Sequence, residues 1–292
     1  MLNEKGGIEC DLTVTRLDEN EFYIVTGTGF ATHDYNWILK NIPPHMTCDL
    51  SDITEQRSVL SLMGPLARDI LARVTEDDIS HEGFSFATGR RIEIAGCPVL
   101  ALRLTYMGEL GWELHMSVDE VGVVYDALMA AGSPRGLKNA GYRSIESCRL
   151  EKGYRAWGSD IGPDHTPVEA GLGWAVKMKS GRNFKGRAAI EAQKAKGVRK
   201  MLACFTVDDP GVVLLGRETI YRNGERVGWL SSGGYGHTIE KSIGYGYVRN
   251  PDGVDREFVM SGSYELDVAL TRMPCQVHME PLYDPSMNKI KA

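Results

Sequence analysis

Apolar and polar residues follow two different periods in the first two thirds of the chain. Strict alternation is typical of a half-buried strand, and apolar residues three and four positions apart are typical of a helix. Alternation predicts strands over residues 8–16, 22–25, 59–63 and 112–116, and two more within 91–106 on either side of Gly96-Cys97-Pro98. Helical spacing predicts helices over 31–39, 118–131 and 140–150, and one over 66–74 that Pro65 begins. Because strands and helices do not alternate regularly, the pattern predicts an α+β fold rather than a doubly wound sheet.

The pattern changes near residue 200 to a series of short strands separated by turn residues. Strands are predicted over 201–205, 244–248, 264–269 and 276–278. Asn223-Gly224 separates two strand-like runs within 218–230, which predicts a hairpin. Such a series predicts a small antiparallel β-barrel, similar to a jelly-roll. We place the boundary after Lys194-Ala195-Lys196-Gly197, which divides the chain into domains 1–197 and 198–292.

Composition and charge exclude several classes of protein. The 292 residues carry a net charge of -6 without a long Lys/Arg run, which argues against nucleic acid as a partner. No segment approaches the roughly 20 apolar residues of a membrane helix, and no apolar segment after Met1 predicts a signal peptide. The six cysteines and seven histidines are scattered, so the sequence predicts reduced thiols and no metal site.

A glycine-rich loop, residues 26–32, follows a predicted strand and precedes a predicted helix. Thr32 stands where a dinucleotide fingerprint has its third glycine. Asp49 has the spacing of the acidic partner, but Pro43-Pro44 interrupts the intervening segment. The loop therefore predicts neither flavin nor nicotinamide binding.

Three groups of polar residues are candidates for chemistry, and each has a plainer interpretation. Asp11 lies inside a predicted strand: the pattern favours a solvated face, and the alternative is a carboxylate that accepts a proton. Residues 106–113 (YMGELGWE) form either a simple hairpin or a pocket wall, where aromatic rings stack and a carboxylate takes two N–H donors. The third group consists of Arg143, Arg149, Glu151, Arg155 and Trp157. For most of these residues the plainer interpretation is that they form ion pairs on the surface.

Several motifs occur in an order that resembles aminomethyltransferases of the glycine-cleavage T-protein type. The segment 2–12 is similar to their N-x-x-G-G-I-x-x-D signature, and the later matching segments are 63–65, 106–113, 149–154, 166–172 and 186–187. In detail the chain resembles the C-terminal half of sarcosine dehydrogenase and, less closely, dimethylglycine dehydrogenase. The segments that carry this resemblance are GELGWELH, NAGYRSIES, EKGYRAWGSDI and AGLGWAVKMKS. The resemblance covers essentially the whole chain.

The resemblance implies a fold and a set of site residues. The fold is a ring of a ferredoxin-like α+β unit, a second α+β unit and a C-terminal β-barrel, with tetrahydrofolate in the central hole. Asp11 matches the catalytic carboxylate, Tyr106 and Glu113 match the pair that grips the pterin, and Thr13 matches a pocket residue. Ile145 stands where the family has a folate-contacting arginine, and Arg143, two places earlier, is the candidate for that contact.

The resemblance also implies a reaction and its partners. A flavin domain oxidises sarcosine or dimethylglycine, and the folate part captures the one-carbon unit as 5,10-methylenetetrahydrofolate, starting from the iminium or from formaldehyde. Domain 1–197 is then N-terminally incomplete, and FAD belongs to a missing N-terminal domain or to a partner subunit. The alternatives are a free-standing aminomethyltransferase and a folate-binding module without catalysis. The implied compartment is the cytoplasm of a bacterium or the mitochondrial matrix of a eukaryote.

Overall fold

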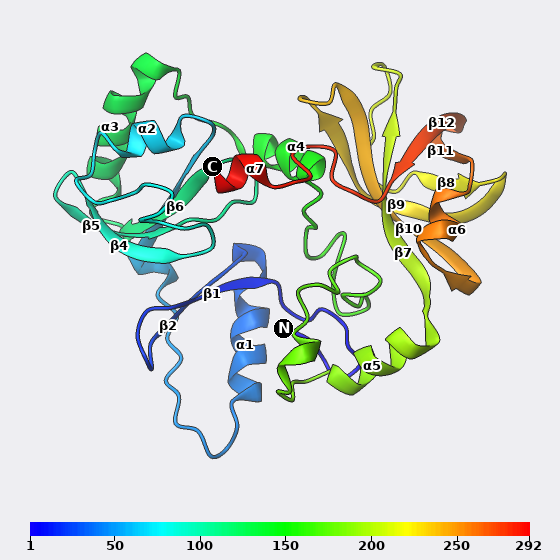
Figure 1. The fold of residues 1–292 in the computed structure, drawn as a ribbon, viewed down its shortest axis with the longest axis horizontal. Helices are drawn as coiled ribbons and strands as arrows, with labels where there is room; N and C mark the ends of the chain where they lie inside the picture. Colours follow the sequence, from blue (N-terminus) through cyan, green and yellow to red (C-terminus); the bar gives the residue numbers. More distant parts are fainter. The chain divides into compact units, whose positions relative to one another are not determined.

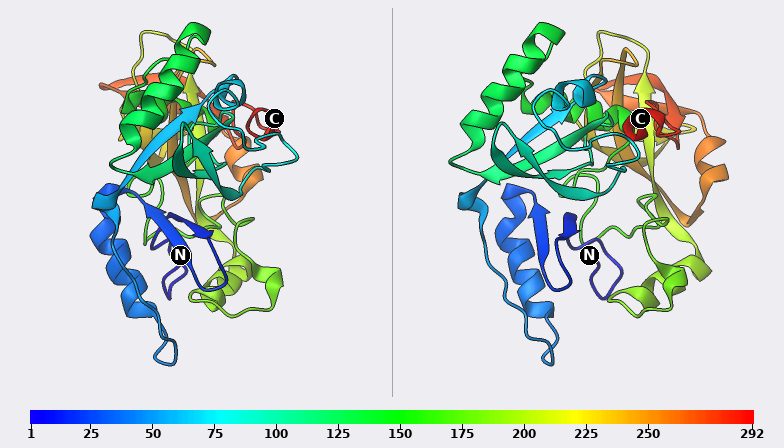
Figure 2. Two further views of the ribbon diagram at one scale, coloured as in Figure 1. Left: turned by 90° about the vertical axis from the view of Figure 1, so that its left-hand side faces the viewer. Right: turned by 60° about the vertical axis from the view of Figure 1, so that its left-hand side comes forward.

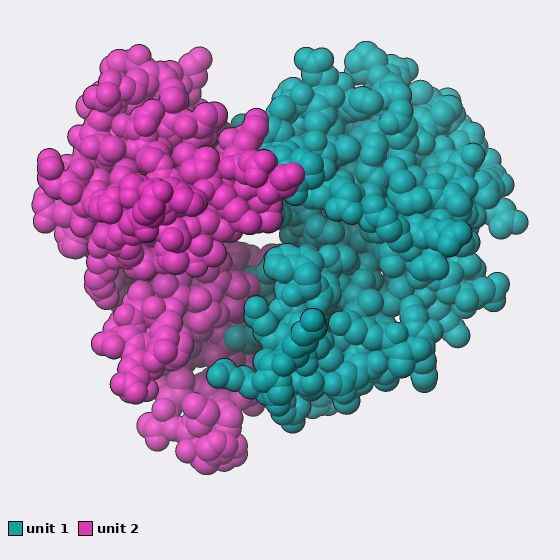
Figure 3. Space-filling view, in the orientation of Figure 1, with its two compact units in different colours: residues 1–11, 143–285 teal, residues 12–142, 286–292 magenta.

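The chain passes back and forth between two structural units. The computed structural model describes residues 1–292. Unit 1 consists of residues 1–11 and 143–285, and unit 2 consists of residues 12–142 and 286–292 (Figure 3). The division into domains 1–197 and 198–292 stays a prediction. None of the helices is both long enough and apolar enough to cross a membrane.

Unit 2 is built on a four-stranded antiparallel sheet with the strand order β3-β6-β5-β4. The strands are β3 (Arg57–Met63), β4 (Gly89–Ile94), β5 (Cys97–Leu102) and β6 (Gly111–Ser117). Helices α2 (Ala67–Leu71) and α3 (Val121–Gly132) cover one face of this sheet. A hairpin of β1 (Leu12–Arg16) and β2 (Phe22–Thr26) lies on the other side with α1 (Ala31–Asn41), as Figure 1 and Figure 2 show.

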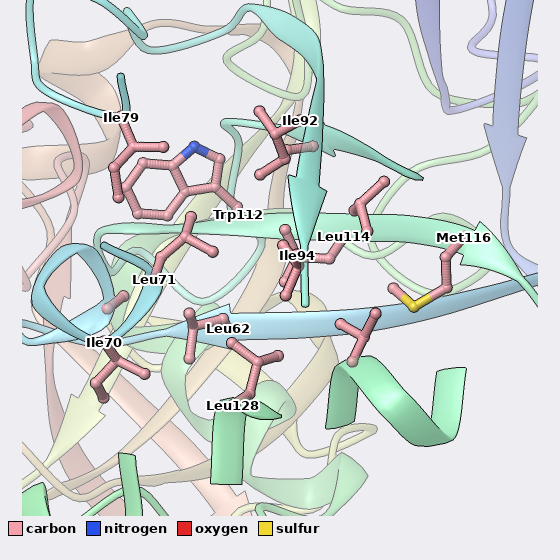
Figure 4. Close-up of a cluster of buried hydrophobic side chains, with 14 of the residues drawn as sticks. Leu62, Ile70, Leu71, Ile79, Ile92, Ile94, Trp112, Leu114, Met116 and Leu128 are labelled. Atoms are coloured by element: carbon pink, nitrogen blue, oxygen red, sulfur yellow. The ribbon is translucent and has the colours of Figure 1, made fainter. Parts of the chain in front are cut away.

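The core of unit 2 lies between the sheet and these two helices. Successive side chains of a strand point to opposite faces, so Trp112, Leu114 and Met116 of β6 all enter the core. Figure 4 shows them packed with other side chains of the sheet and with Leu71 and Leu128 of the helices. Each such side chain stabilises the fold by about 1.5–3 kcal/mol through burial. The same alternation leaves the odd-numbered residues of β6 on the opposite face.

The end of the chain returns to unit 2. Helix α7 (Asn288–Lys291) contributes the buried side chain of Ile290. Arg68 Nη2 donates a hydrogen bond of 2.6 Å to the carbonyl oxygen of Ala292. Four short 3₁₀ helices complete the chain: Thr28–Phe30, Thr54–Gln56 and Ser133–Arg135 in unit 2, and Met178–Ser180 in unit 1.

Unit 1 contains a closed antiparallel barrel with the strand order β10-β7-β12-β11-β8-β9. Asn223 and Gly224 have φ angles of 53° and 84° and form the turn of the β8–β9 hairpin, as predicted. Apolar side chains fill the barrel. Its strands are β7 (Val198–Val207), β8 (Thr219–Arg222), β9 (Glu225–Gly236), β10 (Lys241–Val254), β11 (Tyr264–Val268) and β12 (Thr271–His278), and the helices of unit 1 are α4 (Tyr142–Lys152), α5 (Arg187–Lys196) and α6 (Arg256–Met260).

Two local predictions are wrong. The first strand begins at Leu12 and not at Ile8, because the backbone before it bonds elsewhere: Ile8 donates to His165 and Glu9 donates to Met1. Asp11 therefore precedes a strand instead of lying inside one. Pro65 precedes α2 without starting it, since that helix begins at Ala67.

Candidate functional site

The face of β6 that points away from the core carries two polar side chains. Glu113 and His115 alternate with the core residues and therefore share this face. The Glu113 side chain is 22% exposed and the His115 side chain 2%, and their closest atoms, Glu113 Oε2 and His115 Nε2, are 3.4 Å apart. A carboxylate with partial access to solvent thus lies beside a buried imidazole.

The β1–β2 hairpin covers the imidazole. The Tyr23 hydroxyl lies 3.2 Å from His115 Nδ1, and the two rings meet edge to face with centroids 5.4 Å apart. Cross-strand partners share a face, so Thr15, which pairs with Tyr23, and Thr13, which pairs with Val25, point toward the same sheet. Two elements of unit 2 therefore place Thr13 and Glu113 on surfaces that face each other.

The pKa of Tyr23 reflects the charges near this cluster. Burial raises the pKa of its phenol, the positive charge of Arg57 lowers that pKa, and the negative charge of Glu113 raises it. Arg57 begins β3, the strand that pairs with β6. The cluster thus contains one cation and one carboxylate, and a bound group with N–H donors would meet the carboxylate.

Tyr106 lies in the loop that joins β5 to β6. Strands β5 and β6 pair antiparallel, so this segment connects neighbouring strands of one sheet, which is compatible with both the hairpin and the pocket-wall interpretations. Thr105 Oγ1 accepts hydrogen bonds from the backbone N–H groups of Met107 and Gly108, and these bonds hold the loop. Tyr106 itself is exposed to solvent. The loop therefore presents an aromatic ring just before the strand that carries Glu113.

The other two predicted site residues belong to unit 1. Asp11 is exposed and directly precedes β1. Arg143 is exposed in the first turn of α4, and Ile145 in the same helix is half-buried. The roles of the predicted site residues are assigned by resemblance and stay predictions. These residues are Asp11, Thr13, Tyr106, Glu113 and Arg143.

Two members of this cluster, His115 and Tyr23, are not identified from the sequence. The spacing of His115 from Glu113 on an alternating strand is the signal that could have identified His115. In unit 1, the sequence-based prediction is wrong about two other residues. Arg149 and Glu151 are buried, so the interpretation as surface ion pairs is wrong for them. Arg149 pairs with buried Asp160, and Glu151 Oε1 accepts two backbone N–H groups of residues 238 and 239. These contacts are structural.

Comparison with known proteins agrees with this architecture. Residues 1–180 match the family model described as the GCVT N-terminal domain, and residues 200–284 match the glycine cleavage T-protein C-terminal barrel domain. The chain belongs to the glycine cleavage T-protein family. The crystal structure of the glycine cleavage system aminomethyltransferase T from Bartonella henselae is similar, with a TM-score of 0.81 and 26% identity over 98% of this chain and 75% of that chain. The predicted T-protein fold, mixed α and β elements followed by a closed antiparallel barrel, is confirmed.

Two dehydrogenases of this family are similar over the whole chain. Sarcosine dehydrogenase, mitochondrial, from Mus musculus is 41% identical over 100% of this chain and 33% of that protein. Dimethylglycine dehydrogenase, mitochondrial, from Homo sapiens is 34% identical over 100% of this chain and 33% of that protein. The chain thus spans about a third of the length of these relatives, and the match confirms the predicted resemblance to their C-terminal region.

Proposed function

We propose that this chain binds tetrahydrofolate and transfers to it a one-carbon unit that a flavin domain has released from an N-methyl amine. The one observation that carries the proposal is the partly exposed Glu113 carboxylate on the face of β6 that points away from the core. Membership of the glycine cleavage T-protein family and the 41% sequence identity with sarcosine dehydrogenase support the proposal. The product is 5,10-methylenetetrahydrofolate, and the amine is sarcosine or dimethylglycine.

Glu113 is suited to recognise a pterin ring. Pterins present two parallel N–H donors, and an ionised carboxylate accepts such a pair with two charge-assisted hydrogen bonds. The exposed ring of Tyr106 offers a stacking surface for a flat heterocycle, and Thr13 adds a hydroxyl on the facing hairpin. Arg143 is the candidate for a contact with the anionic part of the folate.

The transfer itself needs a group that moves protons. A folate nitrogen attacks the iminium carbon, CH2=N+, and forms a C–N bond. The second folate nitrogen then attacks the same carbon and displaces the amine, which leaves with the two N–H protons of the folate. We propose that Asp11 accepts a proton from the attacking nitrogen and passes it to the leaving amine, which is general acid–base catalysis. Holding both reactants together supplies a further part of the rate.

The partner in this scheme is an FAD-binding domain or subunit. The proposal follows from the relatives, which are about three times as long as this chain and are named as dehydrogenases. Both are named mitochondrial, so we propose the mitochondrial matrix as the compartment. A flavin-bound partner would deliver the iminium before water converts it to formaldehyde.

The likeness to aminomethyltransferase T favours a second candidate, a transferase that takes the one-carbon unit from an aminomethylated carrier. The two candidates differ in their donor. Incubation of the chain and tetrahydrofolate with an aminomethyl-lipoyl carrier, or with formaldehyde, distinguishes them by which donor gives methylenetetrahydrofolate faster than the same mixture without the chain.

Folate binding is tested by calorimetry on Glu113→Gln. The variant keeps the shape and removes the charge, and we expect about 10- to 100-fold weaker binding, since each buried donor left unpaired costs about 1–3 kcal/mol. Glu93→Gln is the matched control, because Glu93 is an exposed carboxylate on β4 of the same sheet. Equal affinities of wild type and Glu113→Gln would contradict the proposed binding site.

The role of Asp11 is tested by rate at matched folate occupancy. The rate of methylenetetrahydrofolate formation from formaldehyde, measured by stopped flow after subtraction of the spontaneous rate without protein, should fall about 10²- to 10⁴-fold in Asp11→Asn, the range of general acid–base catalysis. Folate affinity should stay nearly unchanged. A variant as fast as wild type would favour a binding module without catalysis.

A further inference from the structure

The Glu113 carboxylate has a polar neighbour, His115, to which the proposed function assigns no role. His115 lies two residues further along β6 on the same face, with its ring buried under Tyr23. We propose that His115, held by Tyr23, is a positioning residue that fixes the ionised carboxylate of Glu113 in the orientation that receives the N–H donors of the ligand. The inference rests on the proposed folate-binding function and adds a residue to it.

The contacts of the imidazole decide which nitrogen carries the proton. Nδ1 lies 3.2 Å from the Tyr23 hydroxyl, which can donate or accept. Nε2 is buried, has no hydrogen-bond partner, and has Glu113 Oε2 at 3.4 Å. If Nε2 lacked a proton, its lone pair would face a carboxylate oxygen in a buried place, and the two would repel. The tautomer with the proton on Nε2 removes this repulsion, and Tyr23 then donates to Nδ1.

The same tautomer directs the carboxylate. An Nε2–H group beside Oε2 is a donor without a hydrogen bond, and buried donors normally find an acceptor. A rearrangement that shortens the distance by about 0.4 Å and aligns the N–H with Oε2 would give an ordinary hydrogen bond. With Oε2 held by the imidazole, the plane of the carboxylate is fixed, and Oε1 together with the second lone pair of Oε2 is available to the ligand.

The charged groups near the imidazole are compatible with a proton on Nε2. Arg57 on β3 and Glu113 on β6 act on the Tyr23 phenol with opposite charges. Tyr23 on β2 is the group that covers the ring from the hairpin side. An imidazole with a proton on Nε2, toward Glu113, stabilises the carboxylate charge. Fixing the carboxylate before binding reduces the entropy that the ligand must otherwise overcome.

Two substitutions separate the two nitrogens of the ring. The side-chain amide of His115→Asn reaches the position of Nδ1, so this variant keeps the contact with Tyr23 and loses the donor toward Glu113. The longer amide of His115→Gln reaches the position of Nε2, so it keeps the donor toward Glu113. Both variants remove the ring, which makes each a control for the packing effect of the other. Tyr23→Phe removes the hydroxyl that fixes the tautomer.

The measurement is tetrahydrofolate affinity by calorimetry at pH 7 on the full chain. We expect about tenfold weaker binding for His115→Asn, because the carboxylate of Glu113 has lost the donor that orients it. His115→Gln should restore binding to within about threefold of wild type, and Tyr23→Phe should lie between them.

Each outcome decides between the inference and the function on which it rests. Wild-type affinity in His115→Asn, while Glu113→Gln binds weakly, would overturn the positioning role and leave the folate site intact. Equal losses in both His115 variants would also overturn it, because the ring would then act through packing. Unchanged binding in Glu113→Gln would instead contradict the proposed function. Thermal unfolding of every variant checks that unit 2 is folded.

Discussion

Arg149 and Asp160 form an ion pair in unit 1 that solvent does not reach. Arg149 Nη1 lies 2.7 Å from Asp160 Oδ2, and the side chains are 1% and 0% exposed. Ser231 and Ser232 of β9 both donate to Asp160 Oδ1, the second at 2.8 Å. The pair therefore ties the helix α4 to the wall of the barrel.

The first prediction concerns this pair. Asp160→Asn leaves the Arg149 cation buried, and breaking a buried pair by changing one partner costs about 3–5 kcal/mol. Glu146 still bonds Arg149, so we expect a loss near 3 kcal/mol in the free energy of unfolding, measured by urea titration. Glu280→Gln removes one partner of the exposed pair with Arg256 and should change stability by less than about 1 kcal/mol. Similar losses in both variants would contradict a special role for the buried pair.

A second prediction concerns the core of unit 2. Trp112 is fully buried, with the Phe84 ring at 6.0 Å and the guanidinium groups of Arg68 and Arg103 at 5.3 and 5.8 Å from its ring. Trp112→Ala should lower the free energy of unfolding by about 3–5 kcal/mol through the cavity it leaves. Trp174 is 81% exposed, and Trp174→Ala should stay within about 0.5 kcal/mol of wild type. Chemical denaturation followed by circular dichroism compares the two, and equal losses would contradict this account of the core.

The third prediction concerns pH. Burial, and then the charge of Lys200, lower the pKa of His165 from 6.5 to about 4. The imidazole stacks on Tyr247 with centroids 4.6 Å apart. An NMR titration should find its midpoint near pH 4, and Lys200→Met should raise that midpoint while burial still keeps it below 6.5.

This depressed pKa also determines the sign of a stability effect. Between about pH 6.5 and pH 4 the unfolded chain binds a proton at His165 that the folded chain does not, so acidification through this window favours unfolding. The contribution of His165 to stability is complete above pH 6.5. His165→Gln should lose part of the pH dependence of unfolding in this window, and a variant with the full wild-type dependence would contradict the assignment.

A fourth prediction compares two glycines at which an added side-chain carbon would contact no neighbouring atom. An added Cβ would find nothing within 4 Å at Gly224 or at Gly122. Gly224 has a φ of 84° in the β8–β9 turn, where an alanine is strained by roughly 1 kcal/mol or more. Gly122 lies in α3, where alanine is the better helix former by about 0.5–1 kcal/mol. Gly224→Ala should therefore lower the melting temperature and Gly122→Ala should raise it; shifts of the same sign would contradict the backbone explanation.

Much of the fold could be predicted because its signals are local. The alternation in 112–116 is produced by one face buried on the core, and the hairpin at Asn223-Gly224 is produced by two residues that tolerate positive φ. The order of motifs places the chain in its family and gives Tyr106 and Glu113 as candidate site residues, whose roles stay predictions. Neither inference required knowledge of which segments meet in space.

The sequence by itself determined the kinds of elements, their approximate order along the chain and the family. Only the tertiary structure decided which polar side chains are buried and which distant residue covers them. Tyr23 and His115 are 92 positions apart, and Arg149 needs Asp160 and β9 to become a buried cation. The physical reason is that periodicity reports which face of a segment is apolar, whereas the state of a polar side chain depends on the partner that another segment brings to it.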